Sequence, residues 1–512
     1  MSGRPLHKRM GRAALVVAAG VLLSRVLGLL REVALADLIG ANAAGDAYRV
    51  AFIIPDFLNY LLAGGYMAIT FIPILSRYFA DDDEAGAWEA FTAIARPVGL
   101  AMAALVGIGM LIAGPVIELV TALGPEEVRE ATRLTRIILP AQFFFVIGTL
   151  LMAVQYARER FLIPTLAPIV YNLMIILGGL VLTDRSDPTA DGFAWGVLAG
   201  AVIGNFLIQV YGARQEGLRL RRGLPLSQPV VREYLLLALP LMLGQSLVLL
   251  DESFARVFGT QLGEGPTSQL GFARQTMLVP IGIVAQAAGV AAYPYLARLV
   301  EERKLHELTT TLARAIRYVI VASLVATAAL MALSVPTIRT LFERGRFGPA
   351  DTAAAAGALV FYAIGIPFWG VQQLLARGFY ARRQMWVPVG VGTAATVLAI
   401  PVYIVLRDLM EIRGIALAST VSIAAYTLVL GVIWIRRTGA HVVDGVARTT
   451  GRALVPAAVA GTAAWIAAEA LAGVADGFTG SLLQLVAGAV VAGGVFLALA
   501  GWMGTVRRIS DD

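Results

Sequence analysis

The chain has 512 residues, of which 58% are hydrophobic and 15% are charged, and its mean hydropathy is +0.77. This composition is typical of an integral membrane protein and excludes a soluble enzyme. There is no cysteine, which excludes disulfides and thiolate metal sites. The net charge of +7 would suit a nucleic-acid partner in a soluble protein. In a membrane protein, however, excess Lys and Arg gather in cytoplasmic loops, so we expect no nucleic-acid partner.

Apolar segments of about 20 residues, long enough to cross a bilayer, recur along the whole chain. No connection between them is long enough for a soluble domain, so the sequence predicts an all-α polytopic membrane protein. The first segment follows a basic N-terminus and imitates a signal peptide, but Arg25 interrupts it, and we expect an uncleaved helix. Cleavage after the weak Ala-Leu-Ala site at 34–36 is the alternative. The fourteen predicted spans are 12–38, 46–76, 92–121, 130–156, 162–183, 192–212, 233–260, 268–297, 312–336, 353–378, 386–406, 413–435, 451–474 and 480–503.

Basic residues gather in every second connection, whereas the connections at 124–130, 183–192 and 263–268 are poorer in Lys and Arg. The positive-inside rule therefore places the basic set in the cytoplasm. Both termini fall in that set, which agrees with an even number of spans. On helix 6, Gly196, Gly200 and Gly204 form a ridge of small residues that predicts close helix packing.

Two stretches of the chain resemble each other at nearly one offset. YARERFLIP (156–164) matches YARRQMWVP (380–388), Pro55 has a counterpart in Pro280, and Pro73 has one in Pro294. Six helices per copy give both copies one orientation, related by an axis along the membrane normal. We therefore predict two six-helix bundles and two extra helices, with boundaries at 1–222, 223–440 and 441–512.

The first two spans carry charges at depths where a lipid-facing helix is normally uncharged. A charge at the bilayer centre costs about 2.5–3.5 kcal/mol on insertion scales, so it usually faces a bundle interior or a wet cavity. We interpret Arg25, Arg31 and Glu32 in this way. The alternative, that a residue at a helix end reaches the headgroups, is preferred for Asp37, Asp46 and Arg49. The full set is Arg25, Arg31, Glu32, Asp37, Asp46, Arg49 and Asp56.

The seventh and eighth spans form a second charged element. Glu252 and Arg256 are four residues apart, share a helix face and are expected to pair. Together with Asp251 they could form a structural ion pair or couple to a cation, and both interpretations stay open. Arg274 adds a further cation on the eighth span.

The sequence lacks the motifs of covalent chemistry: there is no Walker loop, HExxH, GxSxG or dinucleotide fingerprint after a strand. His7, His306 and His441 are too scattered for a metal site. We therefore predict a transporter rather than an enzyme.

Six stretches resemble the MurJ/MviN lipid II flippases of the multidrug/oligosaccharidyl-lipid/polysaccharide exporter superfamily. The resemblance implies two six-helix bundles around a central cavity, with helices 13 and 14 shaping a groove for a lipid tail. It also implies that a polyprenyl-pyrophosphate-linked cell-wall precursor moves to the outer leaflet by alternating access. The stretches are SRVLGLLRE (24–32), GDAYRVAFIIPDFL (45–58), FIPILSRY (71–78), ERFLIPTLAPIVYN (159–172), LFERGRFGPADT (341–352) and GFYARRQMWVP (378–388).

The resemblance also identifies candidate substrate contacts. Arg25, Arg31 and Asp46 match family positions, Glu32 replaces an acidic neighbour, and arginines can grip a pyrophosphate bidentately. The chain departs from the family where Asn59, Tyr60 and Gln275 replace arginines and Gly64 replaces a Glu, and Arg274 lies one position from the family arginine. Whether these losses change the substrate is left open. Helix 11 has no Asp, Glu or Asn, so a sodium site is unsupported. The predicted substrate-binding set is Arg25, Arg31, Glu32, Asp46, Asn59, Arg274 and Gln275.

We therefore expect a multi-pass, monomeric protein of the bacterial cytoplasmic membrane, both termini cytoplasmic, that flips lipid II. Its cavity would be lined by helices 1, 2, 7 and 8. No cofactor is expected, while coupling to the membrane potential or to a monovalent cation stays open. The alternatives are a flippase for another isoprenoid-linked glycan, a cation-coupled multidrug antiporter and a non-transporting scaffold. The sequence fixes neither the glycan nor the coupling ion.

Overall fold

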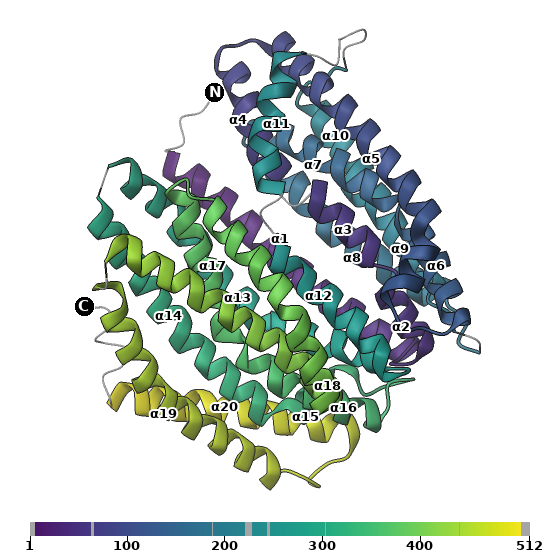
Figure 1. The fold of residues 1–512 in the computed structure, drawn as a ribbon, viewed down its shortest axis with the longest axis vertical. Helices are drawn as coiled ribbons and strands as arrows, with labels where there is room; N and C mark the ends of the chain where they lie inside the picture. Colours follow the sequence, from purple (N-terminus) through teal and green to yellow (C-terminus); the bar gives the residue numbers. More distant parts are fainter. Residues whose placement is uncertain are drawn as a thin grey trace. The chain divides into compact units, whose positions relative to one another are not determined.

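The computed structural model describes residues 6–62, 66–186, 188–220, 228–242, 246–302, 304–439 and 441–502, and its regular structure over these ranges is helical (Figure 1). The chain divides into two compact units, residues 1–243 and 244–512. The chain is thus the predicted all-α polytopic membrane protein. The division falls inside the predicted seventh span, and the predicted three-part division at 222 and 440 stays a prediction.

Unit 1 contains the first six predicted spans and the start of the seventh. Helix α11 belongs here because it packs on α3, α4 and α5. The helices are α1 (Leu6–Leu38), α2 (Ala43–Val50), α3 (Ile53–Leu62), α4 (Tyr66–Ala80), α5 (Glu84–Val120), α6 (Pro125–Ile138), α7 (Ala141–Ala157), α8 (Leu162–Leu182), α9 (Asp191–Gly200), η1 (Ala201–Leu207), α10 (Ile208–Gln215) and α11 (Pro229–Met242).

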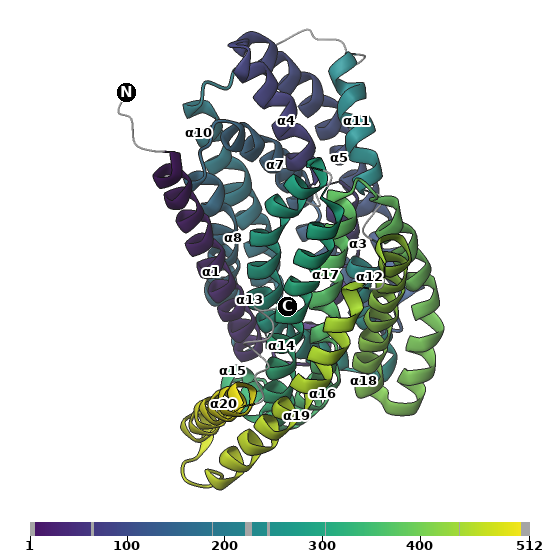
Figure 2. The same ribbon diagram turned by 90° about the vertical axis from the view of Figure 1, so that its left-hand side faces the viewer.

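Unit 2 contains the rest of the seventh span and all later ones. Helices α19 and α20 lie side by side and pack on α14 and α15 (Figure 2), so the two additional spans are part of this unit. The helices are α12 (Ser246–Gly259), η2 (Thr260–Leu262), α13 (Pro266–Glu301), α14 (Leu305–Ala332), α15 (Ser334–Phe342), α16 (Pro349–Ile364), α17 (Ile366–Ala381), α18 (Trp386–Thr438), α19 (His441–Ala470) and α20 (Gly477–Trp502).

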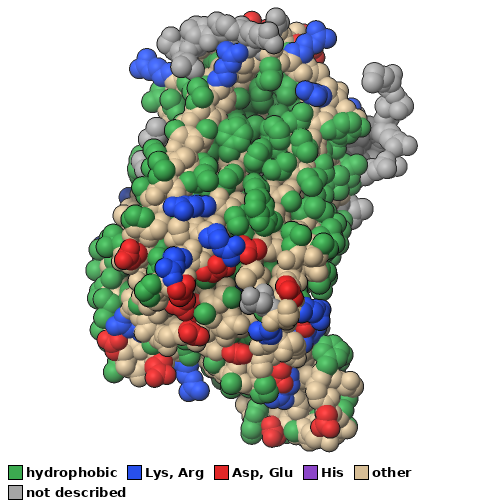
Figure 3. Space-filling view, turned by 90° about the vertical axis from the view of Figure 1, so that its right-hand side faces the viewer, with side chains coloured by type: hydrophobic (Ala, Val, Ile, Leu, Met, Phe, Trp, Pro, Cys, Tyr) green, Lys and Arg blue, Asp and Glu red, His purple; other side chains and the backbone are tan. Residues whose placement is uncertain are grey.

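Each of the fourteen predicted spans coincides with one or more of these helices. Within the described ranges, eight helical segments are long and apolar enough to cross a membrane, and a ninth is formed if α16 and α17, bent by 43°, count as one span. Helix α18 contains two predicted spans. Its backbone leaves the helical conformation at Glu411 (φ 51°, ψ −129°), and the two spans are the helical arms on either side of this kink. Hydrophobic side chains cover much of the face shown in Figure 3, as expected for a surface in contact with lipid.

The predicted glycine ridge is confirmed. A Cβ atom at Gly196 would lie 2.7 Å from the Cα of Ile175, and one at Gly200 would lie 2.9 Å from the backbone oxygen of Tyr171. At Gly204 the distance to the Ala167 oxygen would be 2.9 Å. The absence of side chains along this ridge therefore lets α9 and η1 approach the backbone of α8.

The sixth span changes its winding at η1, a π-helical turn over Ala201–Leu207. Such turns leave carbonyl groups without their usual i+4 donors. The Gln209 amide donates to the Gly204 oxygen at 3.1 Å and to the Ile163 oxygen at 3.2 Å, which satisfies two backbone acceptors inside the bundle. This matters in a membrane because no water is present to do so.

The internal repeat is visible in backbone geometry as well as in sequence. Glu159 and Arg383 occupy the same place in the two YAR stretches, and both have left-handed backbones, with φ of 59° and 57°. Both residues follow the end of a helix, α7 in unit 1 and α17 in unit 2. The two stretches therefore end their helices with the same turn.

Candidate substrate-binding site

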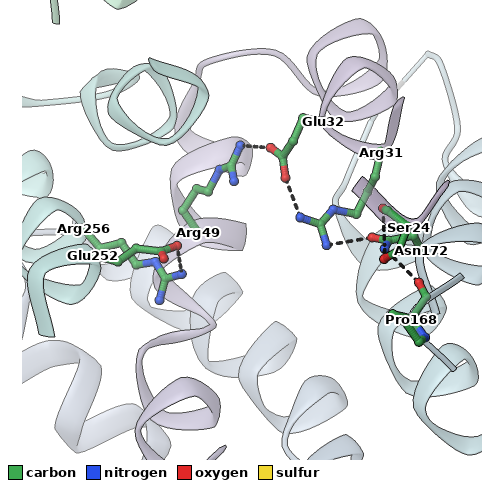
Figure 4. Close-up of polar contacts among 8 residues, drawn as sticks. All are labelled: Ser24, Arg31, Glu32, Arg49, Pro168, Asn172, Glu252 and Arg256. Carbon is green, nitrogen blue, oxygen red and sulfur yellow. Dashed lines mark hydrogen bonds and ion pairs between the residues drawn. The ribbon is translucent and has the colours of Figure 1, made fainter. Parts of the chain in front are cut away.

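In unit 1 one buried carboxylate connects two spans. Glu32 on α1 is 2% exposed and accepts hydrogen bonds from two guanidinium groups, one per oxygen. Arg31 Nη2 lies 2.8 Å from Oε1, and Arg49 Nη2 on α2 lies 2.5 Å from Oε2 (Figure 4). Because two arginines share one carboxylate, this three-residue cluster carries one positive charge in excess.

Arg31 also contacts the fifth span. Its Nη1 donates to the Asn172 Oδ1 at 3.3 Å, while the amide nitrogen of Asn172 donates to the Pro168 oxygen at 2.9 Å and to the Ser24 oxygen on α1 at 3.4 Å (Figure 4). Asn172 therefore fixes α8 against α1 and orients the guanidinium of Arg31. We name Arg31, Glu32, Arg49 and Asn172 the unit-1 cluster.

In unit 2 a second buried carboxylate gathers donors from several helices. Asp251 on α12 is 3% exposed and pairs with Arg274 on α13, which is 6% exposed. The Tyr403 hydroxyl donates to Asp251 Oδ1 at 2.7 Å, and the Ser419 hydroxyl donates to Oδ2 at 3.0 Å. Both oxygens of Asp251 therefore have partners inside unit 2, which compensates the cost of burying the carboxylate.

Glu252 and Arg256 form the ion pair predicted from their spacing, with 2.6 Å between Oε1 and Nη2 (Figure 4). Glu252 also lies 3.9 Å from the Nε of Arg274, and the Arg274 guanidinium lies 5.6 Å from the centroid of the Trp369 ring. Of the two interpretations left open for these acids, the structure favours ion pairing for Glu252. We name Asp251, Arg274, Tyr403 and Ser419 the unit-2 cluster.

The two clusters occupy corresponding places in the repeat. Arg49 and Arg274 are 225 residues apart, as are Pro55 and Pro280, so each arginine precedes its proline by six residues. Each arginine binds a carboxylate on the span before it, Glu32 in unit 1 and Asp251 in unit 2. The repeat therefore preserves an ion pair between the first and second span of each unit.

The structure places the predicted site residues in different environments. Arg25 is exposed and has no ion-pair partner among the described residues. The headgroup interpretation is wrong for Asp46 and Arg49: Asp46 is 1% exposed, and Arg49 binds Glu32 inside unit 1. Asp37, at the end of α1, lies 3.7 Å from Arg185.

Asn59 on α3 and Gln275 on α13 are half-buried. Gly64 and the side chain of Tyr60 lie outside the described residues. Sequence reasoning missed Asn172, Tyr403 and Ser419 as members of the two clusters. An isolated Asn inside an apolar span was a signal for Asn172, whereas a Tyr and a Ser give no comparable signal. The joint role predicted for Arg25, Arg31 and Arg274, and the shared cavity, stay predictions.

The clusters are suited to anion recognition rather than to metal binding. Over the described ranges, no group of three or more His, Cys, Asp or Glu side chains could hold a metal ion. Guanidinium groups in an apolar span, by contrast, offer forked donors that match phosphate oxygens.

Comparison with known proteins agrees with this geometry. The family model described as lipid II flippase MurJ matches residues 35–488. A probable lipid II flippase MurJ of Vibrio cholerae is 28% identical over 81% of each chain, and a lipid II flippase MurJ of Burkholderia cenocepacia is 28% identical over 76% of each. The solved structure of a lipid II flippase MurJ in an inward closed conformation superimposes with a TM-score of 0.78 at 20% identity, covering 96% of this chain and 99% of that one. An inward-facing multidrug resistance MATE family transporter gives 0.67 at 16% identity, covering 83% and 97%.

Proposed function

Because the chain belongs to the lipid II flippase MurJ family, we propose that it carries lipid II from the cytoplasmic to the outer leaflet. It is a multi-pass protein of the bacterial inner membrane, and its cargo is a lipid-linked precursor of the cell wall. In this proposal the protein performs no covalent chemistry. Its residues bind the precursor at the cytoplasmic leaflet and release it at the outer leaflet, because the binding site opens to each side in turn.

The observation that carries the proposal is the shared carboxylate of the unit-1 cluster. Two guanidinium groups bind the single side chain of Glu32 among apolar helices. A pyrophosphate brings negative charge and several acceptor oxygens, so it can take over hydrogen bonds that Glu32 now accepts. Arg31 is the residue best placed to change partners, since 26% of its side chain is exposed while Glu32 is buried.

The exchange gives each residue of the cluster a role. Glu32 neutralises part of the positive charge when no substrate is bound, which keeps two buried arginines from repelling each other. Asn172 holds the Arg31 guanidinium in one orientation, so that its fork is ready for a phosphate. Arg49 remains as the counterion of Glu32 when Arg31 binds substrate.

Arg25 and Arg274 extend the proposal as further contacts of the pyrophosphate. Arg25 is exposed and therefore accessible, whereas Arg274 must first leave Asp251. We also propose that the protein acts as a monomer with both termini in the cytoplasm, and that the membrane potential or a monovalent cation drives the cycle. The basic connections support the orientation by the positive-inside rule.

Complementation tests the function directly. The chain is expressed in a bacterial strain whose own lipid II flippase can be depleted, and growth is followed after depletion. We expect growth to be restored, and labelled lipid II to become accessible from outside the cell. Normal membrane abundance without growth or accessibility would reject lipid II as the cargo. Growth rescue in a strain depleted of a different isoprenoid-linked glycan flippase would identify the alternative.

A further inference from the structure

The internal repeat places two corresponding arginines, one in each unit, at the ends of corresponding helices. Arg158 follows α7 and Arg382 follows α17 at the same place in the two YAR stretches. Each guanidinium lies over an aromatic ring, 3.9 Å from the Phe79 centroid in unit 1 and 5.6 Å from the Trp434 centroid in unit 2. In each unit this arginine therefore lies over an aromatic ring, although the ring comes from the second span in unit 1 and from the twelfth span in unit 2.

The two units differ in what neutralises the charge. In unit 1, Arg158 pairs with Glu84 and Arg160 lies 3.2 Å from Glu216. In unit 2 the position of Arg160 holds Gln384, a neutral residue, which accepts from Arg437 at 2.9 Å. Glu216 ends α10 in unit 1, whereas the corresponding end of α18 carries Arg436 and Arg437.

Four arginines thus gather at one end of α17 and α18. We name Arg382, Arg383, Arg436 and Arg437 the unit-2 arginine cluster. None of the four forms an ion pair within the part of the chain that the structure describes, and neither 376–388 nor 434–438 contains an acidic residue. Glu307, at the nearby start of α14, lies 3.8 Å from Lys304 instead. Among the residues that the structure describes, the cluster is therefore cationic without an internal counterion.

The electrostatics of Arg382 agree with a role in anion binding. Burial, and secondarily the charge of Arg437, lower the pKa of Arg382, which lies beyond the end of α17. A nearby positive charge disfavours the protonated, charged form of an arginine. A bound anion would favour that form and so raise the pKa again. Trp386, 61% exposed, follows Arg383 by three residues at the start of α18, and an exposed Trp is typical of the membrane interface.

We propose that the unit-2 arginine cluster binds the phosphate headgroup of an anionic phospholipid. The positive-inside rule assigns this end of the unit to the cytoplasmic side, where the leaflet is negatively charged. A guanidinium fork matches a phosphodiester, and Arg437 and Arg382 can each give two donors to it. The unit-2 arginine cluster shares no residue with the unit-1 cluster, and its proposed ligand does not depend on the nature of the transported cargo.

Lipid binding to the purified full-length chain tests the proposal. The protein in a neutral detergent is titrated with phosphatidylglycerol or phosphatidylcholine, and bound lipids are counted by native mass spectrometry. We expect at least one phosphatidylglycerol to bind more tightly than phosphatidylcholine. The double variant Arg382→Gln/Arg437→Gln should weaken that site on the order of tenfold or more, since charge-assisted hydrogen bonds are lost.

Two further variants make the result specific. Arg158→Gln removes the corresponding arginine of unit 1 and should leave phosphatidylglycerol affinity unchanged. Gln384→Glu keeps every arginine but gives Arg437 an internal carboxylate, so it should weaken lipid binding while preserving the fold. Unchanged affinity in Gln384→Glu and in the double variant, or an equal loss in Arg158→Gln, would overturn the proposal. Displacement of the lipid by inorganic phosphate at the same concentration would show instead a site for free phosphate.

Discussion

Arg49 and Arg274, 225 residues apart in sequence, each bind a buried carboxylate on the preceding span of their own unit. The two pairs differ in their remaining contacts. Glu32 is shared with a second arginine, so the three residues Arg31, Glu32 and Arg49 carry one excess positive charge, whereas the Asp251–Arg274 pair is balanced in charge and Asp251 also accepts from two hydroxyl groups. This difference supports the proposal that Arg31 exchanges Glu32 for the substrate more readily than Arg274 leaves Asp251.

Two substitutions of Arg31 distinguish the contribution of its positive charge from that of its forked guanidinium group. Arg31→Ala removes the guanidinium that we propose binds the pyrophosphate, together with its hydrogen bonds to Glu32 and Asn172. A charge-assisted hydrogen bond contributes about 1.5–3 kcal/mol, so loss of the one to the pyrophosphate should lower substrate retention about tenfold or more. Arg31→Lys keeps the charge without the fork and should retain partial function. Complementation at matched membrane abundance measures both. Full activity of Arg31→Ala would eliminate the pyrophosphate contact, and loss of protein rather than of activity would indicate a structural ion pair.

Removing Asp251 should destabilise unit 2. Asp251→Asn leaves Arg274 with only the more distant and more exposed Glu252 as a counterion, and breaking a buried pair costs up to about 3–5 kcal/mol. Adding Arg274→Met in the same chain should recover much of that loss, since the stranded charge is then gone. Thermal unfolding in detergent provides the measurement. Equal stability of the single and double variants would show that the two side chains are not coupled.

Replacing Glu411 by glycine should stabilise the protein. Its backbone, with φ 51° and ψ −129°, lies where a side chain is strained by about 1–3 kcal/mol. We expect Glu411→Gly to raise the unfolding temperature. Asp408→Gly, three residues earlier within the helix, is the control and should lower it, because glycine is about 1 kcal/mol unfavourable in a helix. A decrease for both variants would contradict the strain at Glu411.

Adding a methyl group to the glycine ridge should lower the stability of the protein. Gly200→Ala would push a Cβ against the backbone of Tyr171, and overpacking of this kind costs about 1–3 kcal/mol. Gly107→Ala on α5 is the matched control, because a Cβ there meets nothing within 4 Å. Membrane abundance and unfolding temperature should fall for the first variant only. Equal values for both would show that α9 does not depend on close approach to α8.

The orientation can be tested at the C-terminus. An alkaline phosphatase fused after Asp512 should be inactive, whereas a fluorescent protein that folds only in the cytoplasm should be bright, because both termini are expected inside. Active phosphatase at this position would reverse the topology. It would also move the unit-2 arginine cluster away from the negatively charged leaflet.

Features that depend on local sequence were predictable. The helices found at the fourteen predicted spans follow from length and hydropathy, the glycine ridge from a four-residue repeat, and the Glu252–Arg256 pair from helix periodicity. Each of these requires only the geometry of one helix. The sequence could therefore determine them without knowledge of the neighbouring helices.

Partners on different helices were not predictable, because their pairing depends on how each helix is rotated about its axis. Arg49 was assigned to the headgroups, yet it turns inward to a carboxylate 17 residues earlier. Tyr403 and Ser419 meet Asp251 across more than 150 residues of chain. The offset shared by Pro55, Pro280 and the two arginines was a signal that could have linked Arg49 to Arg274.

The contacts of Asp251 also affect how the two arms of α18 can move. Tyr403 precedes the break of α18 at Glu411 and Ser419 follows it, so one carboxylate holds both arms of this hairpin on α12. We therefore expect the eleventh and twelfth spans to move together as one body when unit 2 rearranges. A bulky label on one arm should report the displacement of the other, and a spin-label distance measured between the two arms should stay constant through the transport cycle.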